Sequence, residues 1–146
     1  MQLVSSDCLR LNKFYKEHKD KARAKASDVI FAAIGSGSSP ETTYAALRLL
    51  PYANFLFLRS VFTHPHYRGQ GIAAQLIHHA TNTIFKQSPE LAIYTLPTPK
   101  ALSLYQRLGF KPVTAVNIPA ELQASYKRFR QVNNDCMVMV LHSSVG

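Results

Sequence analysis

The fold of this chain is decided by the stretch from Phe55 to Ala80, FLFLRSVFTHPHYRGQGIAAQLIHHA. Its first part is almost continuously apolar, which predicts a central strand over 55–63 that is covered on both faces. After a proline break, apolar residues recur at helical spacing from Ile72, so a helix begins near Gly71. Main-chain amides at a helix start lack intrahelical acceptors, and glycines leave the approach to them open. The stretch therefore predicts an anion-binding loop, although an ordinary glycine-containing turn has the same local pattern.

Outside this stretch the sequence predicts alternating strands and helices without repeats. Strands are expected at 2–4, 28–34, 42–50, 91–96, 110–114 and 136–141, and helices at 7–24, 72–86, 99–108 and 119–131. A polar turn is expected at 35–40. The helix at 99–108 has the clearest limits, because Thr98 suits an N-cap, Pro99 a first helical residue and Gly109 a stop.

The connections between these segments predict a mixed, mostly antiparallel sheet. Short turns join three consecutive strands between 28 and 63 into an antiparallel meander. A helix separates the strand at 55–63 from that at 91–96, so a right-handed crossover makes these two strands parallel neighbours. The last strand is expected to pair with that at 110–114. We therefore expect an α/β (α+β) fold with a central sheet of six to seven strands flanked by helices.

Length and composition fit one domain, 1–146. The 146 residues are 47% hydrophobic, which suffices for a single core. The two cysteines, Cys8 and Cys136, show no disulfide framework and are expected to be reduced, which favours a cytoplasmic location. Apolar runs are short and are interrupted by Pro51 and Arg59, so no membrane span is expected.

The formal net charge of +9 suits an anionic partner. Basic residues gather along the first predicted helix, between Lys13 and Lys25, and again at Lys127, Arg128 and Arg130. They fit solvated helix faces, an acidic substrate or a highly phosphorylated cofactor. Nucleic acid is the other candidate partner. It is not expected here, because no aromatic platform for stacking bases accompanies the charge.

Two motifs resemble those of the GNAT superfamily of N-acyltransferases. Arg68, Gly71 and Ala73 fill the family's acyl-CoA signature, which runs Arg or Gln, two residues, Gly, one residue, then Gly or Ala. The segment 101–110, ALSLYQRLGF, resembles the family's later helix, which carries a tyrosine and ends in Leu-Gly-Phe. The resemblance covers roughly 28–142. It implies an acetyl-CoA-dependent N-acetyltransferase in which two parallel strands splay apart around the acyl-CoA arm.

The resemblance also implies the residues of the site. In the family, the main chain of the central strand holds the pantetheine arm and polarises the acyl carbonyl, which corresponds to Val61, Phe62 and Thr63. The pyrophosphate is expected on the main-chain amides of Arg68, Gly69, Gln70, Gly71, Ile72, Ala73 and Ala74. Tyr105 matches the tyrosine that protonates the coenzyme A sulfur, and a positioned phenol can donate as charge develops there. Thr98 stands where the family often has an asparagine that binds the pantetheine arm.

A general base is the missing component. Many relatives place a glutamate on one of the splayed strands, whereas 59–60 and 93–95 contain no carboxylate. His64 follows the central strand and titrates near neutrality, so it is the candidate base, directly or through water. A surface loop histidine would look the same. No third ligand accompanies His64 and His66, so no metal is expected.

These observations lead to direct transfer of an acetyl group from acetyl-CoA to a primary amine in a ternary complex. Few acids and several basic residues, among them Arg59, surround the expected cleft. This favours a small acidic amine, or a peptide or protein amine, over polyamines and aminoglycosides. The alternative, suggested by the missing carboxylate, is a catalytically idle acyl-CoA-binding or sensing module. The terminal strands could also pair across a homodimer.

Overall fold

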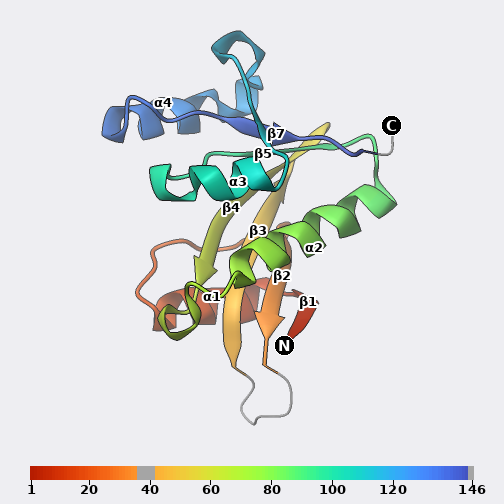
Figure 1. The fold of residues 1–146 in the computed structure, drawn as a ribbon, viewed down its shortest axis with the longest axis vertical. Helices are drawn as coiled ribbons and strands as arrows, with labels where there is room; N and C mark the ends of the chain where they lie inside the picture. The colour runs from red at the N-terminus through yellow and green to blue at the C-terminus, as the bar shows by residue number, and fades with distance from the viewer. Residues whose placement is uncertain (36–41, 145–146) are drawn as a thin grey trace.

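The computed structural model describes residues 1–35 and 42–144, so the polar turn expected at 35–40 lies almost entirely outside the described residues. Figure 1 shows a central sheet with helices on both sides. The strands are β1 Gln2–Ser6, β2 Val29–Ile34, β3 Thr43–Pro51, β4 Phe55–Thr63, β5 Ala92–Thr95, β6 Lys111–Pro112 and β7 Met139–Leu141. Their order across the sheet is β1-β2-β3-β4-β5-β7-β6. Each neighbouring pair is antiparallel except β4 and β5, which are parallel, so the expected mixed sheet is confirmed.

The helices are α1 Cys8–Glu17, α2 Ile72–Gln87, α3 Leu102–Arg107 and α4 Gln123–Val132. Short 3-10 turns cover Pro65–Tyr67, Pro99–Ala101, Ala115–Asn117 and Ala120–Leu122. No helix in the described part of the chain is long and apolar enough to cross a bilayer. Cys8 and Cys136 are both free thiols.

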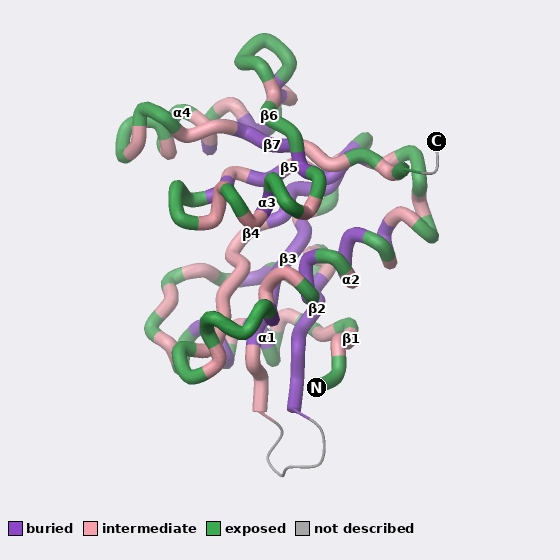
Figure 2. Tube along the Cα trace, viewed as in Figure 1, coloured by how far each residue is buried: buried purple, intermediate pink, exposed green. Residues whose placement is uncertain are grey.

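The apolar sequence predicts that both faces of β4 are buried, and this is confirmed for residues 55–58, whereas residues 59–63 are half-buried. Leu56 and Leu58 belong to the cluster that packs against α2 and α3. Phe55 and Phe57 belong to a cluster on the opposite face, which includes Leu122 just before α4. Successive side chains of a strand point to opposite faces, so one strand joins two cores. Helix α1 packs on the same face as α4, over β2 and β3. Figure 2 shows how buried residues follow the central strands.

The first helix is shorter than expected. It ends at Glu17, and Lys19 adopts a left-handed backbone with φ of 58°. The chain then turns back along α1, where Asn12 donates its side-chain amide to the carbonyl of Ala24 at 3.1 Å and accepts the amide of Ala24 at 2.6 Å. The prediction of a helix to residue 24 was wrong, because a contact across twelve residues outweighs the helix propensity of the alanines and lysines.

The two C-terminal strands are also shorter than expected. β6 covers Lys111–Pro112 and β7 covers Met139–Leu141, although they pair as predicted, with Lys111 opposite Val140. Pro112 has no amide hydrogen, which limits how far this ladder can extend.

Candidate active site

A cleft opens where β4 and β5 stop pairing. Their last register pair is Leu58 with Thr95, after which β5 ends while β4 continues to Thr63. The cleft has a volume of about 360 Å³. Its walls come from β4, the start of α2, the segment 95–98, α3 and α4. The splayed parallel pair expected from the sequence is therefore present, and it encloses space for a ligand.

The glycine loop at the edge of this cleft has the geometry of an anion site. Gly69 and Gly71 have φ of 79° and 76°, a left-handed backbone that favours glycine. A Cβ atom built on either would meet nothing within 4 Å. No side chain caps α2 at Gly71, and its first turn contains no acidic residue. Because the amide of Gln75 makes the bond to Gly71 at 3.2 Å, the amides before it lack intrahelical acceptors. The loop can therefore hold a diphosphate.

Arg68 ties this loop to the end of β4. Its Nε donates to the carbonyl of Thr63 at 3.1 Å, and its guanidinium lies 5.3 Å from the centre of the Phe62 ring. Val61 and Thr63 line the cleft. Phe62 does not, because its ring packs edge-on against Phe14 of α1, 5.7 Å between centroids. Only the main chain of Phe62 is therefore available to a ligand in the cleft.

The remaining predicted cofactor residues divide between the cleft and the loop. Ala73 and Thr98 line the cleft, and the side chain of Thr98 makes no capping hydrogen bond. Gln70 is exposed, Ala74 is half-buried, and Ile72 is buried in the core. Ile72 can therefore offer a ligand only its main-chain amide.

Tyr105 of α3 lines the cleft, and the residue is 5% exposed. Its hydroxyl hydrogen-bonds the side chain of Thr95, whose own hydroxyl donates to the carbonyl of Leu58 at 3.0 Å. This chain of bonds stands at the point where the strands separate. Burial raises the pKa of Tyr105 to about 12, although the bond to Thr95 lowers it in part. The phenol is therefore neutral and carries its proton at physiological pH.

The structure does not bring His64 into the cleft with Tyr105. His64 lines a second cavity of about 460 Å³ beside α1, where its ring lies 4.5 Å from that of His18. Partial burial, and then the charges of His18, His66 and Arg68, lower its pKa below the ordinary value. The imidazole is therefore largely neutral at pH 7. Among the described residues no three His, Cys, Asp or Glu side chains gather as a metal site.

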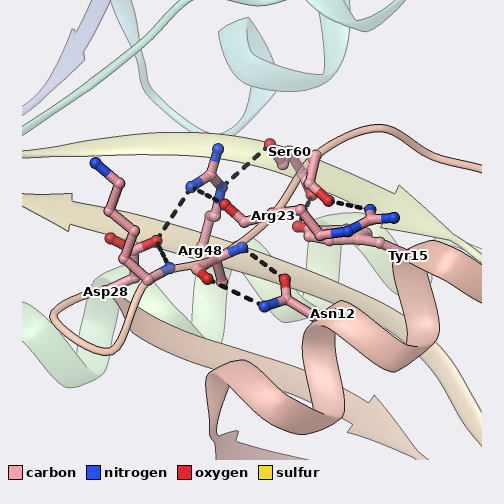
Figure 3. Close-up of polar contacts among 9 residues, drawn as sticks. Asn12, Tyr15, Arg23, Asp28, Arg48 and Ser60 are labelled. Carbon is pink, nitrogen blue, oxygen red and sulfur yellow. Dashed lines mark hydrogen bonds and ion pairs between the residues drawn. The ribbon is translucent and has the colours of Figure 1, made fainter.

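A buried polar network, missed by sequence reasoning, lies under β4 on the α1 side (Figure 3). Ser60 has φ of 57°, close to an irregular register between β3 and β4. The hydroxyl of Tyr15 donates to the carbonyl of Ser60 at 2.6 Å, and Arg48 Nε donates to its Oγ at 3.3 Å. Arg48 Nη1 also donates to Asp28 at 3.1 Å and to the Arg23 carbonyl at 3.0 Å. The feature of the sequence that could have predicted this network is Arg48, because a charged residue inside an apolar strand must be paired when it is buried.

A family model described as an acetyltransferase (GNAT) domain matches residues 26–112. The chain belongs to the GNAT acetyltransferase family. The matched region of this GNAT chain contains the glycine loop, both splayed strands and Tyr105. It leaves out α4 and β7. No curated protein sequence matches the chain.

Solved structures share the fold of this GNAT chain at low sequence identity. The ribosomal-protein-S18-alanine N-acetyltransferase from Escherichia coli is similar over 99% of this chain and 96% of its own, with 16% identity and a TM-score of 0.69. A chimera of the spermidine N-acetyltransferase SpeG from Vibrio cholerae is similar over 97% of this chain and 96% of its own, with 16% identity and a TM-score of 0.67. N-acetylglutamate synthase from Neisseria gonorrhoeae, in complex with coenzyme A and N-acetylglutamate, gives 13% identity and a TM-score of 0.60. That match covers 96% of this chain but 35% of the synthase.

Proposed function

We propose that this GNAT protein transfers an acetyl group from acetyl-CoA to a primary amine, by direct transfer in a ternary complex. One observation carries the proposal. A single cleft is lined both by Ala73, in the first turn of α2 just after the open glycine loop, and by the buried Tyr105. An anion site and a proton donor at the two ends of one cleft are what transfer from a nucleotide thioester requires.

The chain offers acetyl-CoA a continuous path. The amides of 68–74 would hold the pyrophosphate, the main chain of Val61 to Thr63 would hold the pantetheine arm, and the Thr98 hydroxyl, which lines the same cleft, would contact that arm. When bound, acetyl-CoA supplies an activated acyl group. The Neisseria synthase, 35% of which matches this fold, was solved with coenzyme A, and this supports acetyl-CoA as the cofactor.

The register shift between β3 and β4 is a bulge, in which β4 has one residue more than β3. This bulge fixes the direction of one main-chain amide. The carbonyl of Ser60 points toward α1, where it accepts from Tyr15. The peptide is planar and trans, so the amide of Val61 points the opposite way, away from α1. Such a fixed amide is suited to polarising the acyl carbonyl as charge develops on its oxygen.

Tyr105 acts as a hydrogen-bond donor to the departing sulfur. Its pKa of about 12 lies well above that of an ordinary thiol, about 8.5. Complete proton transfer to the thiolate is therefore uphill, whereas a hydrogen bond that strengthens as negative charge grows is favourable. His64 lies outside the cleft lining, so its role as base requires a water relay from the amine.

The acceptor favoured by the cleft is a small acidic amine, or a peptide or protein amine. Among the described residues that line the cleft, Arg59 is charged and none is a carboxylate. A polycation would meet unbalanced positive charge there. The spermidine and ribosomal-protein acetyltransferases share only the fold with this chain, so they do not choose between acceptors.

A thermal-shift titration followed by an amine panel tests the proposal. Saturation at about a hundred times Kd adds about 2.7 kcal/mol of stability, which raises the melting temperature by roughly 5–10 °C for a chain of this size. Turnover of acetyl-CoA with each amine is then measured as the release of the free thiol of coenzyme A. A thermal shift with no turnover on any amine favours the idle binding module. Absence of both contradicts the proposal.

A further inference from the structure

Arg59 lines the cleft from the face of the sheet opposite α2. It lies on β4 just beyond the last pair with β5, and its guanidinium lies 5.4 Å from the centre of the Phe57 ring. Phe57 belongs to the cluster on the α4 face, and Phe129 of α4 lines the same cleft. Tyr105 and Ala73 line it from the α2 and α3 face. The cleft therefore passes between the splayed strands, with the glycine loop on one face and Arg59 on the other.

Among the residues that the structure describes, no acidic side chain pairs with Arg59. Arg48 is neutralised by Asp28 at 3.1 Å, with both side chains almost fully buried. Arg59 is half-buried, yet within residues 1–35 and 42–144 no carboxylate lies within ion-pair distance of it. Burial first, and then the charges of Arg48 and Arg128, lower its pKa, so these cations act on one another. Arg128 is exposed and donates to the hydroxyl of Ser125 at 3.2 Å.

A guanidinium in this setting is selective for one kind of ligand. Its planar N–H groups match a carboxylate through two parallel hydrogen bonds, and partial burial strengthens such a pair relative to water. The Arg59 guanidinium contacts the Phe57 ring and makes no hydrogen bond within the described residues, so those N–H groups are available. The half-buried Phe129 offers an apolar surface beside it for a short carbon skeleton.

We propose that Arg59 binds a carboxylate of the acceptor, so that the substrate is a small amine bearing a carboxylate. The inference rests on the proposed acetyl transfer and deepens it, because it names the group that selects the acceptor. The carboxylate would sit on the α4 side of the sheet and direct the amine through the gap between the strands. Polyamines would be rejected by the same charge.

The test uses the full chain with saturating acetyl-CoA and matched pairs of amines. Alanine and β-alanine are compared with alaninamide and β-alaninamide, and phosphoethanolamine and spermidine complete the panel. The amides have the more easily deprotonated amine, so intrinsic reactivity favours them, and a preference for the acids must come from the protein. We expect kcat/KM to be about tenfold or more higher for the acids. Higher turnover of the amides or of spermidine overturns the inference, and higher turnover of phosphoethanolamine replaces the carboxylate by a phosphate.

Variants assign that preference to one side chain. Arg59→Met is expected to lower kcat/KM for the acids by about tenfold to a hundredfold, mainly through KM, and to leave the amides unchanged. Lys127→Met removes the same charge from an exposed position outside the cleft lining and is expected to change neither. An equal loss on acids and amides in Arg59→Met contradicts the role given to Arg59.

A binding measurement separates this inference from the proposed function. Glutarate, which has carboxylates but no amine, is expected to raise the melting temperature of the protein saturated with coenzyme A. It should not do so in Arg59→Met, whose response to coenzyme A alone should match the wild type. A response to coenzyme A without one to glutarate overturns only the carboxylate site. No response to coenzyme A overturns the proposed function as well.

Discussion

The hydroxyl of Tyr15 donates a 2.6 Å hydrogen bond to the main-chain carbonyl of Ser60, across 45 residues of sequence. Tyr15 belongs to α1, and Ser60 is the non-glycine residue of β4 with a left-handed backbone. A serine in that conformation is strained, so the surrounding contacts must stabilise it. This bond, with those of Arg48, therefore links the position of α1 to the direction of the amide of Val61 in the cleft.

Removing this hydroxyl is expected to reduce both stability and turnover. Tyr15→Phe leaves a buried carbonyl without its donor, which costs about 1–3 kcal/mol of unfolding free energy. The freed bulge would no longer aim the Val61 amide, so kcat should fall by roughly tenfold or more. Urea unfolding and steady-state kinetics measure the two effects.

The matched control for that change is Tyr126→Phe on α4, a half-buried tyrosine whose hydroxyl makes no hydrogen bond to the residues that the structure describes. Coenzyme A affinity should stay near wild type in Tyr15→Phe, because the glycine loop is not touched. A variant that loses stability but keeps full kcat would show that the bond serves folding alone.

Gly71→Ala is expected to weaken cofactor binding more than it weakens the fold. The left-handed backbone makes any side chain cost about 1–2 kcal/mol. The added methyl group would also occupy the open space above the loop, where nothing lies within 4 Å. Calorimetric titration with coenzyme A should show an affinity lower by about tenfold or more.

Gly109→Ala is the control for backbone strain, since Gly109 has φ of 95° and its Cβ would be an ordinary 3.5 Å from Leu141. It should lower stability with coenzyme A affinity unchanged. Equal affinities in the two variants would mean that the loop at 68–74 does not hold the diphosphate.

Tyr105→Phe is expected to lower kcat by roughly a hundredfold while the thermal shift with coenzyme A remains. The ring still fills its buried place, but no hydroxyl can donate to the departing sulfur. The release of coenzyme A thiol measures kcat, and a thermal shift on the same preparation measures the response to coenzyme A. Unchanged kcat would remove Tyr105 from the chemistry.

The same phenol predicts how stability depends on alkaline pH. The native pKa of about 12 lies above the ordinary 10.0, so above pH 10 the unfolded chain loses a proton that the native chain keeps. Stability is then lost as pH rises from 10 toward 12, by up to roughly 3 kcal/mol from this group. The burial of Tyr15 raises its pKa too and adds to the same loss. Unfolding curves should show a shallower alkaline decline in Tyr105→Phe than in wild type.

His64→Gln tests the water relay. The pKa of His64 lies below its ordinary 6.5, so the imidazole loses its capacity to accept a proton only below that value. We expect wild-type kcat/KM to fall on an acid limb below pH 6.5. In His64→Gln this limb should be absent, with a neutral-pH rate lower by about tenfold or more. Persistence of the limb would assign the base to another group.

Local patterns in the sequence determined the elements around the site. The apolar run of 55–63 predicted the strand β4, which is buried on both faces over 55–58, and the spacing from Ile72 predicted α2 within a residue of its start. Pro99 and Gly109 limited the predicted helix at 99–108, which begins as a 3-10 turn and stops at Arg107. These features could be predicted because backbone hydrogen bonds, side-chain periodicity and cap residues act between near neighbours.

Only the tertiary structure decided the features that depend on distant contacts. The left-handed serine at position 60 has no local cause, since its partners come from α1 and β3. The separation of His64 from Tyr105 follows from which face of the sheet each meets. So does the place of Arg59, on the face of the sheet opposite α2. A one-residue bulge redirects the side chains that follow it, and long-range packing decides whether a bulge forms. Sequence therefore determined which residues build the cleft, whereas packing decided which of them face each other in it.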